Sequence, residues 1–219
     1  MTSLARQSLA TRDDVLGIRP WTMDEDLIER VRETGLGEGR VAPWLGPVTL
    51  VLGSGSKAEV EANLGAAVSD GVPIQRRRGG GCAVVLDRGN LIVSAVVPAS
   101  GPASIRGRFD RFSSWVIEGL GRLGLPVAER REVSDLCLGD RKIGGAALYL
   151  ERGLAYYTTT LLHSPALHYW ERYLPHPPRE PAYRRGRSHA EFVTSLGDET
   201  GMTALELSSR LAEALGPVP

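Results

Sequence analysis

The sequence has little or none of several features that mark particular classes of protein. Only two cysteines occur in 219 residues, no Cys-x-x-Cys spacing is present, and no apolar run approaches the roughly 18 residues of a membrane-spanning helix. The start of the chain lacks the basic and then apolar segments of a secretory signal peptide. These absences exclude a disulfide scaffold and a membrane anchor, and they predict a soluble, cytoplasmic protein with reduced thiols.

Net charge is also absent, because 26 lysine and arginine residues balance 26 aspartate and glutamate residues. A protein without an overall positive field is not expected to hold nucleic acid or an anionic membrane, so any recognition of an anion must be local. The chain is 42% apolar, which is sufficient for a hydrophobic core in a single domain.

The apolar periodicity predicts helices and strands that are grouped along the chain. Helices of this kind are expected over about 12 residues after Thr22, at 56–70, at 105–123 and after Thr203. Strands are expected at 48–52, 83–86, 91–97, 134–138, 141–150 and 153–162. Turns separate the last three strands as in an antiparallel meander. Grouping of strands and helices favours an α+β fold, with a mixed, largely antiparallel sheet packed against helices.

One stretch interrupts all periodicity, at 174–187, where prolines and then arginines follow one another. No internal repeat is visible. We therefore expect one domain over residues 1–219, with a main body at 20–173 and a final part at 174–219 that holds this loop and a terminal helix.

Three arginines and three glycines stand together in the stretch RRRGGGCAVVLDRGN at 76–90. The glycines allow a ligand to approach main-chain N–H groups, and the arginines can clamp a phosphate or a carboxylate. A glycine-rich turn alone is a weak signal, since many such turns are only tight connections. Neither common phosphate-binding signature fits, and a strand follows the glycines, so a phosphate site at a helix N-terminus is not expected here.

A second stretch, SDLCLGDRKIGG at 134–145, reads as a hairpin with Lys142 near its turn. Gly144 and Gly145 leave open space beside the lysine ammonium, which suits an acidic ligand. Asp135 offers the hard oxygen atoms that Mg²⁺ prefers. Taken alone, the segment is better explained as a surface hairpin with a solvated lysine.

Together, the two stretches resemble the lipoate-protein ligase and octanoyltransferase family, whose catalytic module also underlies biotin protein ligases. The order R-R-x-x-G-G-x-A-V-x-x-D-x-G-N, D-L, K-I-x-G and T-L-L is specific, and the likeness runs from about residue 20 to the terminal helix. The matching positions are Arg76, Arg77, Gly80, Gly81, Ala83, Val84, Asp87, Gly89, Asn90, Asp135, Leu136, Lys142, Ile143, Gly145, Thr160, Leu161 and Leu162.

The resemblance implies a biotin/lipoate-ligase-like catalytic domain that uses ATP and Mg²⁺ to activate lipoate or octanoate as an acyl-AMP. It implies that Lys142 is the catalytic residue, and that Asp135 lies near the nucleotide and its metal ion. The resemblance also implies a set of residues that bind the substrate and the cofactor, and the cysteine beside them is included. These residues are Arg76, Arg77, Gly80, Gly81, Cys82, Ala83, Asn90, Asp135 and Gly145.

The implied partners are lipoyl acceptor domains, namely the acyltransferase subunits of 2-oxo-acid dehydrogenases and the H protein of glycine cleavage. Longer ligases carry a C-terminal accessory domain that has no counterpart before Pro219, so a separate accessory chain is a further expected partner. Two histidines of the family pattern are replaced, one by Leu86 and one by Thr158.

Two other functions remain open. A cysteine-dependent octanoyltransferase would use Cys82, whose pKa the adjacent arginines are expected to lower, and would need no ATP. A non-catalytic binding or scaffold protein would have kept the fold without the histidines. The ligase hypothesis is preferred, because Cys137 is expected to be buried and no cysteine stands where octanoyltransferases carry theirs. It requires Arg77 and Lys142 to share one cavity.

Other polar residues are expected to be less informative. The four histidines show no metal-ligand spacing and are expected in loops or on the surface. The arginines at 184, 185 and 187 are expected in a solvated loop, although they offer positive charge to an acidic acceptor domain. Trp170 is expected to be a packing residue.

Overall fold

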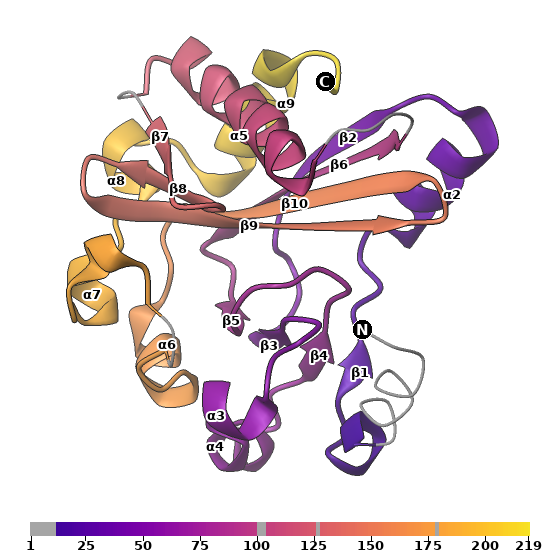
Figure 1. The fold of residues 1–219 in the computed structure, drawn as a ribbon. Helices are drawn as coiled ribbons and strands as arrows, with labels where there is room; N and C mark the ends of the chain where they lie inside the picture. Colours follow the sequence, from indigo (N-terminus) through magenta and orange to yellow (C-terminus); the bar gives the residue numbers. More distant parts are fainter. Residues whose placement is uncertain (1–11, 100–103, 126–127, 178–179) are drawn as a thin grey trace.

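The computed structural model describes residues 12–99, 104–125, 128–177 and 180–219, which form two sheets and the helices around them (Figure 1). The larger sheet has six strands in the order β2-β6-β10-β9-β8-β7, and every neighbouring pair is antiparallel. Its strands are β2 (Glu38–Pro43), β6 (Asn90–Pro98), β7 (Ala128–Arg131), β8 (Asp135–Leu138), β9 (Arg141–Glu151) and β10 (Leu154–Leu162). The expected meander is therefore confirmed as β8–β9–β10.

Two long helices, α5 (Ile105–Arg122) and α9 (Ala204–Leu215), cover one face of this sheet (Figure 1). Their apolar faces enter the main core, in which Phe112 of α5 stacks on Tyr157 of β10. α9 packs so closely on α5 that a Cβ at Gly119 would lie 2.6 Å from a methyl group of Leu215. This packing buries one face of the sheet and leaves the other face for the smaller sheet.

The smaller sheet has four strands in the order β1-β4-β3-β5, and it lies below the larger sheet in Figure 1. β1 (Arg19–Pro20), β4 (Ile74–Arg76) and β3 (Thr49–Leu52) run parallel, whereas β5 (Val84–Leu86) is antiparallel to β3. The fold is thus α+β with mixed but largely antiparallel pairing, as the sequence predicts. The helices α3 (Ala58–Glu61), α4 (Leu64–Ser69) and α6 (Leu167–Tyr173) surround this sheet and share its core.

Two of the expected helices differ from the structure. The helix expected at 56–70 is split into α3 and α4, because Ala62 adopts an extended conformation and Asn63 caps a new helix with its side chain. α2 (Glu25–Thr34) starts without the expected Thr22 capping bond, since Asp24 takes a left-handed conformation at its N-cap. At α9, by contrast, the expected capping box between Thr203 and Glu206 is present.

Short elements connect β10 to α9: α6, the 3₁₀ helix η1 (Ala182–Arg184), α7 (His189–Phe192) and α8 (Leu196–Thr200). Among its described residues, the loop expected at 174–187 carries one short helical element, the 3₁₀ helix η1. Among the residues that the structure describes, no helix is long and apolar enough to cross a bilayer.

Candidate functional site

A cavity of about 730 Å³ lies between the two sheets, and both Arg77 and Lys142 line it. Its apolar wall comes from β3, β5 and β6, and includes Val51, Leu86 and Ile92. β9 and β10, which follow β6 in the larger sheet, also line the cavity. The cavity has the size of a site for a small organic molecule. The requirement that the arginine-rich and lysine-bearing segments share one cavity is met.

A β-bulge explains why the lysine motif has its spacing. Asp135 pairs with Gly145, whereas Cys137 pairs with Lys142, so β9 holds one residue more than β8 between these pairs. The extra residue reverses the alternation of side chains along β9. Lys142 therefore shares a face with Gly145, where a Cβ would lie 3.1 Å from the lysine Nζ, while Ile143 is fully buried in the main core.

Lys142 ends in a chain of polar contacts. Its Nζ donates to Oδ1 of Asp135 at 2.7 Å, and the hydroxyl of Tyr183 donates to Oδ2 of the same carboxylate at 2.7 Å. Burial and the adjacent carboxylate raise the pKa of Tyr183, so the phenol keeps its proton and remains a donor. Lys142 is also one of only two lysines in the sequence, the other being the exposed Lys57.

Arg77 holds the glycine-rich segment in shape. Its guanidinium donates to the carbonyl oxygens of Gly80 and Cys82, each at 2.8 Å, and to that of Val51 at 3.3 Å. Burial lowers the pKa of this arginine to about 10, because desolvation disfavours its charged form. Gly81 has a φ of 98°, which only glycine adopts readily, so the loop conformation requires that residue.

Arg76 was expected to bind substrate, and the structure places it elsewhere. It does not line the cavity; its Nη2 donates to Asp13 at 2.8 Å and its Nη1 donates to the carbonyl oxygen of Gly53 at 2.7 Å. Arg78 also points away from the glycine loop, toward Tyr149 and Glu25. The first and third arginines thus bind other parts of the chain, and only the second, Arg77, lines the cavity.

The D-x-G-N sequence forms a tight turn that orients an amide. Asp87 accepts hydrogen bonds from the backbone N–H groups of Gly89 at 2.6 Å and Ala166 at 2.9 Å. Oδ1 of the fully buried Asn90 accepts from the N–H of Asp87, while its Nδ2 has no partner within the described chain. Because Asn90 lines the cavity, this amide is an available donor for a ligand.

Not all residues of the glycine loop line the cavity. Gly81, Cys82 and Ala83 line the cavity, but Gly80 does not. The N–H of Ala83, expected to face a phosphate, donates instead to the carboxylate of Glu61 at 2.9 Å. Glu61 was not expected at the site, because its only sequence feature was a place in an expected helix. Cys137 is fully buried as expected, and burial raises the pKa of its thiol.

Three residues that were not expected at the site line the cavity from α6, η1 and α7: Trp170, Arg184 and His189. The expectation of a solvated arginine is wrong for Arg184, which is only 4% exposed. Burial, with the nearby charge of Arg184 as a smaller cause, lowers the pKa of His189 to about 4, so this histidine is neutral at pH 7. His163 is likewise buried rather than on the surface.

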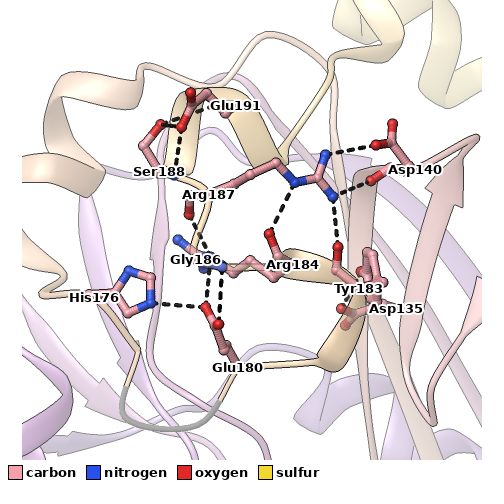
Figure 2. A network of polar contacts seen from close by, with 10 residues as sticks. All are labelled: Asp135, Asp140, His176, Glu180, Tyr183, Arg184, Gly186, Arg187, Ser188 and Glu191. Atoms are coloured by element: carbon pink, nitrogen blue, oxygen red, sulfur yellow. Dashed lines mark hydrogen bonds and ion pairs between the residues drawn. The ribbon is translucent and has the colours of Figure 1, made fainter.

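Figure 2 shows how the segment around Arg184 is held. The guanidinium of Arg187 donates to the side chain and the carbonyl oxygen of Asp140 and to the carbonyl oxygens of Tyr183 and Arg184, at 2.9 to 3.1 Å. Arg187 was also expected to be solvated, and it instead connects this segment to Asp140 through hydrogen bonds. Arg185 alone among the three remains exposed.

Asp135 was expected to hold Mg²⁺, and its present contacts do not suit that role. One of its carboxylate oxygens accepts from an ammonium and the other from a phenol, so a cation would have to displace a donor. Among the described residues, no group of three or more acidic, histidine or cysteine side chains is arranged to hold a metal ion. We assign no chemical step to a metal ion bound by Asp135.

Comparison with known proteins places the whole fold in one family. Residues 18–216 match the family model of the lipoyl protein ligase A/B catalytic domain. A lipoate-protein ligase A homologue of Aeropyrum pernix is 30% identical over 146 residues, which cover 66% of this chain and 53% of that protein. The lipoate-protein ligase LplJ of Bacillus subtilis is 29% identical over 54% of this chain and 35% of its own length. The chain thus spans about half of the first relative and about a third of the second.

A solved structure shares most of the architecture. The structure described as a bi-partite lipoate protein ligase and its E2 lipoyl domain from Thermoplasma acidophilum matches with a TM-score of 0.71 and 25% identity. The match covers 84% of this chain and 73% of that one.

Proposed function

Because the chain belongs to the lipoyl protein ligase A/B catalytic-domain family, we propose that it is an ATP-dependent lipoate-protein ligase. In the first step, the carboxylate of lipoate or octanoate attacks the α-phosphate of ATP, forming acyl-AMP and releasing pyrophosphate. In the second, the ε-amine of a lysine on a lipoyl acceptor domain attacks the acyl carbonyl, an amide forms, and AMP leaves with the bonding electron pair. Mg²⁺ enters this proposal only as the ion that accompanies ATP.

The observation that carries the proposal is the meeting of Lys142 and the Arg77 loop in one cavity. Both steps increase negative charge on oxygen atoms of the carbonyl and the phosphate, and a fixed ammonium stabilises such charge. Lys142 has three N–H donors and spends one on Asp135, which leaves two for these oxygen atoms. The ion pair thus orients the ammonium without using all of its donors.

The other walls suit the acyl substrate. Val51, Leu86 and Ile92 form an apolar surface for a fatty acyl chain or a dithiolane ring. The free Nδ2 of Asn90 is a donor for an acyl oxygen. Leu86, which replaces a histidine of the family pattern, adds to the apolar surface. Arg77 acts on the substrate indirectly, by fixing the backbone of the glycine loop.

The acceptor and a second chain belong to the same proposal. The Thermoplasma ligase is described as bi-partite and is associated with an E2 lipoyl domain. By analogy, we propose lipoyl domains of 2-oxo-acid dehydrogenase acyltransferase subunits, or the glycine cleavage H protein, as acceptors, and an accessory chain for full transfer.

The test is to incubate the chain with lipoate or octanoate and Mg-ATP and to look for acyl-AMP by mass spectrometry. Acyl-AMP, followed by a lipoylated lysine when an acceptor domain is added, supports the ligase. An octanoyl thioester on Cys82, formed from octanoyl acyl carrier protein without ATP, would replace it with the transferase, since Cys82 also lines the cavity. Absence of both products would favour a non-catalytic binding protein.

Tyr183→Phe tests the support of the catalytic lysine. The variant keeps the ring but removes the donor to Asp135, so the carboxylate is expected to hold Lys142 less firmly. A hydrogen bond to a charged group contributes about 1.5 kcal/mol or more, so we expect kcat for acyl-AMP formation to fall about tenfold. KM for lipoate should change less than twofold on the same basis, because Tyr183 is not among the residues that line the cavity. A rise of about tenfold in KM for lipoate with an unchanged kcat would contradict this role.

A further inference from the structure

One wall of the cavity holds a group of buried polar atoms that have no partner. In the parts of the chain that the structure describes, five buried side-chain nitrogen atoms lack a hydrogen-bond partner, and four of them belong to residues that line this one cavity. Three of the four, Trp170 Nε1, Arg184 Nη2 and His189 Nε2, lie on the short elements between β10 and α8. Buried polar groups are normally paired, so a group of unpartnered donors beside one cavity is a candidate for hydrogen bonding to a ligand.

Two of the three side chains contact each other, and Arg184 lies near enough to His189 to affect its charge. The indole of Trp170 and the imidazole of His189 meet edge to face, with 5.7 Å between ring centroids. The guanidinium of Arg184 lies over the ring of Phe192, 4.8 Å from its centroid, and the charge of Arg184 contributes to the low pKa of His189. Trp170 and Phe192 belong to the same apolar cluster. The wall is thus a single compact surface rather than scattered groups.

Charge decides what this wall binds. In the described chain, Arg184 forms an ion pair with Glu180, with 3.8 Å between Nε and Oε2, and Asp135 acts on it more weakly. The Glu180 carboxylate is shared with His176 and the N–H of Gly186 (Figure 2). Nε of Arg184 donates to the carbonyl oxygen of Arg187, whereas Nη2 is buried and has no acceptor among the described residues. A buried cation with an unused donor is best satisfied by an anionic ligand.

Without Arg184, the other cationic side chains of the cavity are too few to balance the negative charge of a nucleotide triphosphate. Besides Arg184, the described cationic side chains that line it are Arg77, whose donors are turned to carbonyl oxygens, and Lys142, which is paired with Asp135. ATP brings a triphosphate into this space, whereas lipoate brings a single carboxylate. The strongest demand for a further positive group therefore comes from the phosphates.

We propose that Arg184, with the indole N–H of Trp170 beside it, forms a phosphate-binding wall of this cavity. The inference rests on the proposed function for the identity of the ligand, a nucleotide phosphate, and on the unpartnered buried donors for the existence of the site. His189 is neutral at pH 7, so it neither neutralises the ligand nor repels Arg184 by a full charge. Arg187 acts at a distance, by holding the backbone of Tyr183 and Arg184 in place.

The experiment measures binding of inorganic pyrophosphate, ATP and lipoate separately by calorimetry. Arg184→Met keeps most of the side-chain volume but removes the charge, and it is expected to weaken pyrophosphate and ATP about tenfold or more. Lipoate affinity should remain within about twofold of that of the original chain on the same scale. Arg185→Met is the matched control, because this neighbouring arginine is exposed and makes no side-chain hydrogen bond among the described residues, and it should change nothing.

Arg184→Lys guards against a folding defect, since it keeps a charge in the buried position but loses the planar fork. It should melt close to the original chain and recover part of the pyrophosphate affinity. Unchanged pyrophosphate and ATP binding in Arg184→Met, loss of lipoate binding instead, or no binding of either phosphate compound by the original chain would overturn the wall. If pyrophosphate binding depends on Arg184 but no acyl-AMP is ever formed, the wall stands and the ligase proposal fails.

Discussion

Replacement of Lys142 by glutamine is expected to lower the rate of acyl-AMP formation by about a thousandfold, the upper range for loss of one group that stabilises an oxyanion. Glutamine is the sharpest substitution, because its amide can still donate to Asp135 and so avoids leaving that buried carboxylate without a partner. What it removes is the positive charge beside the carbonyl and phosphate oxygen atoms. The rate is followed as pyrophosphate release from ATP and lipoate.

The sequence supplies an internal control for this variant. Lys57 is the only other lysine and is exposed, so Lys57→Gln changes the same charge far from the cavity wall and should leave the rate unchanged. Lipoate binding, measured without ATP, should fall far less than the rate in Lys142→Gln. A rate within tenfold of the original chain would show that Lys142 is not the catalytic residue.

Gly53→Ala is expected to damage the cavity through the backbone. A Cβ at this position would lie 1.9 Å from the carbonyl oxygen of Gly81, a contact that no side-chain rotation can relieve. The glycine loop must move away from the turn after β3, which disturbs the bonds that Arg77 makes to the carbonyl oxygens of Gly80 and Cys82. We expect a loss of about 2–4 kcal/mol in the free energy of unfolding, measured with urea, together with a loss of lipoate binding.

Gly55→Ala is the control for this result. It lies two residues away, and a Cβ there would have no atom within 4 Å. Its urea transition and lipoate affinity should match those of the original chain. If Gly53→Ala behaved in the same way as Gly55→Ala, the close approach of the turn to the glycine loop would not be needed for either stability or binding.

The architecture was largely predictable from the sequence, because long apolar patterns identify their elements. The helix at 105–123 and the meander from 134 to 162 were found with small errors at their ends. β2 and β7 were missed because their sequences, EGRVAP and AERR, lack apolar alternation. They are the two edge strands of the larger sheet, so each pairs with a single neighbour. The break between α3 and α4 depends on a single side-chain cap, which an apolar pattern does not report.

The candidate site was predictable only where a motif carried it. Lys142, Asp135 and Asn90 occupy the cavity as the resemblance implied, although their chemical roles remain proposals. Arg76 was misplaced because it ends β4 and Arg77 follows it directly, and the sequence alone does not say which of two adjacent side chains meets the cavity. Arg184 and His189 were overlooked because a polar, proline-rich stretch gives no sign of which side chains will be buried.

The scarcity of lysine has a consequence for a protein that would make an activated acyl group. Acyl adenylates react with unprotonated amines, and apart from Lys142 the side chains of this sequence offer only the amine of Lys57. All other basic side chains, histidines aside, are arginines, whose guanidinium groups stay protonated and unreactive at neutral pH. An acyl-AMP that left the cavity would meet almost no lysine amine on the surface of this protein. The scarcity of lysine therefore limits acylation of the protein by its own intermediate.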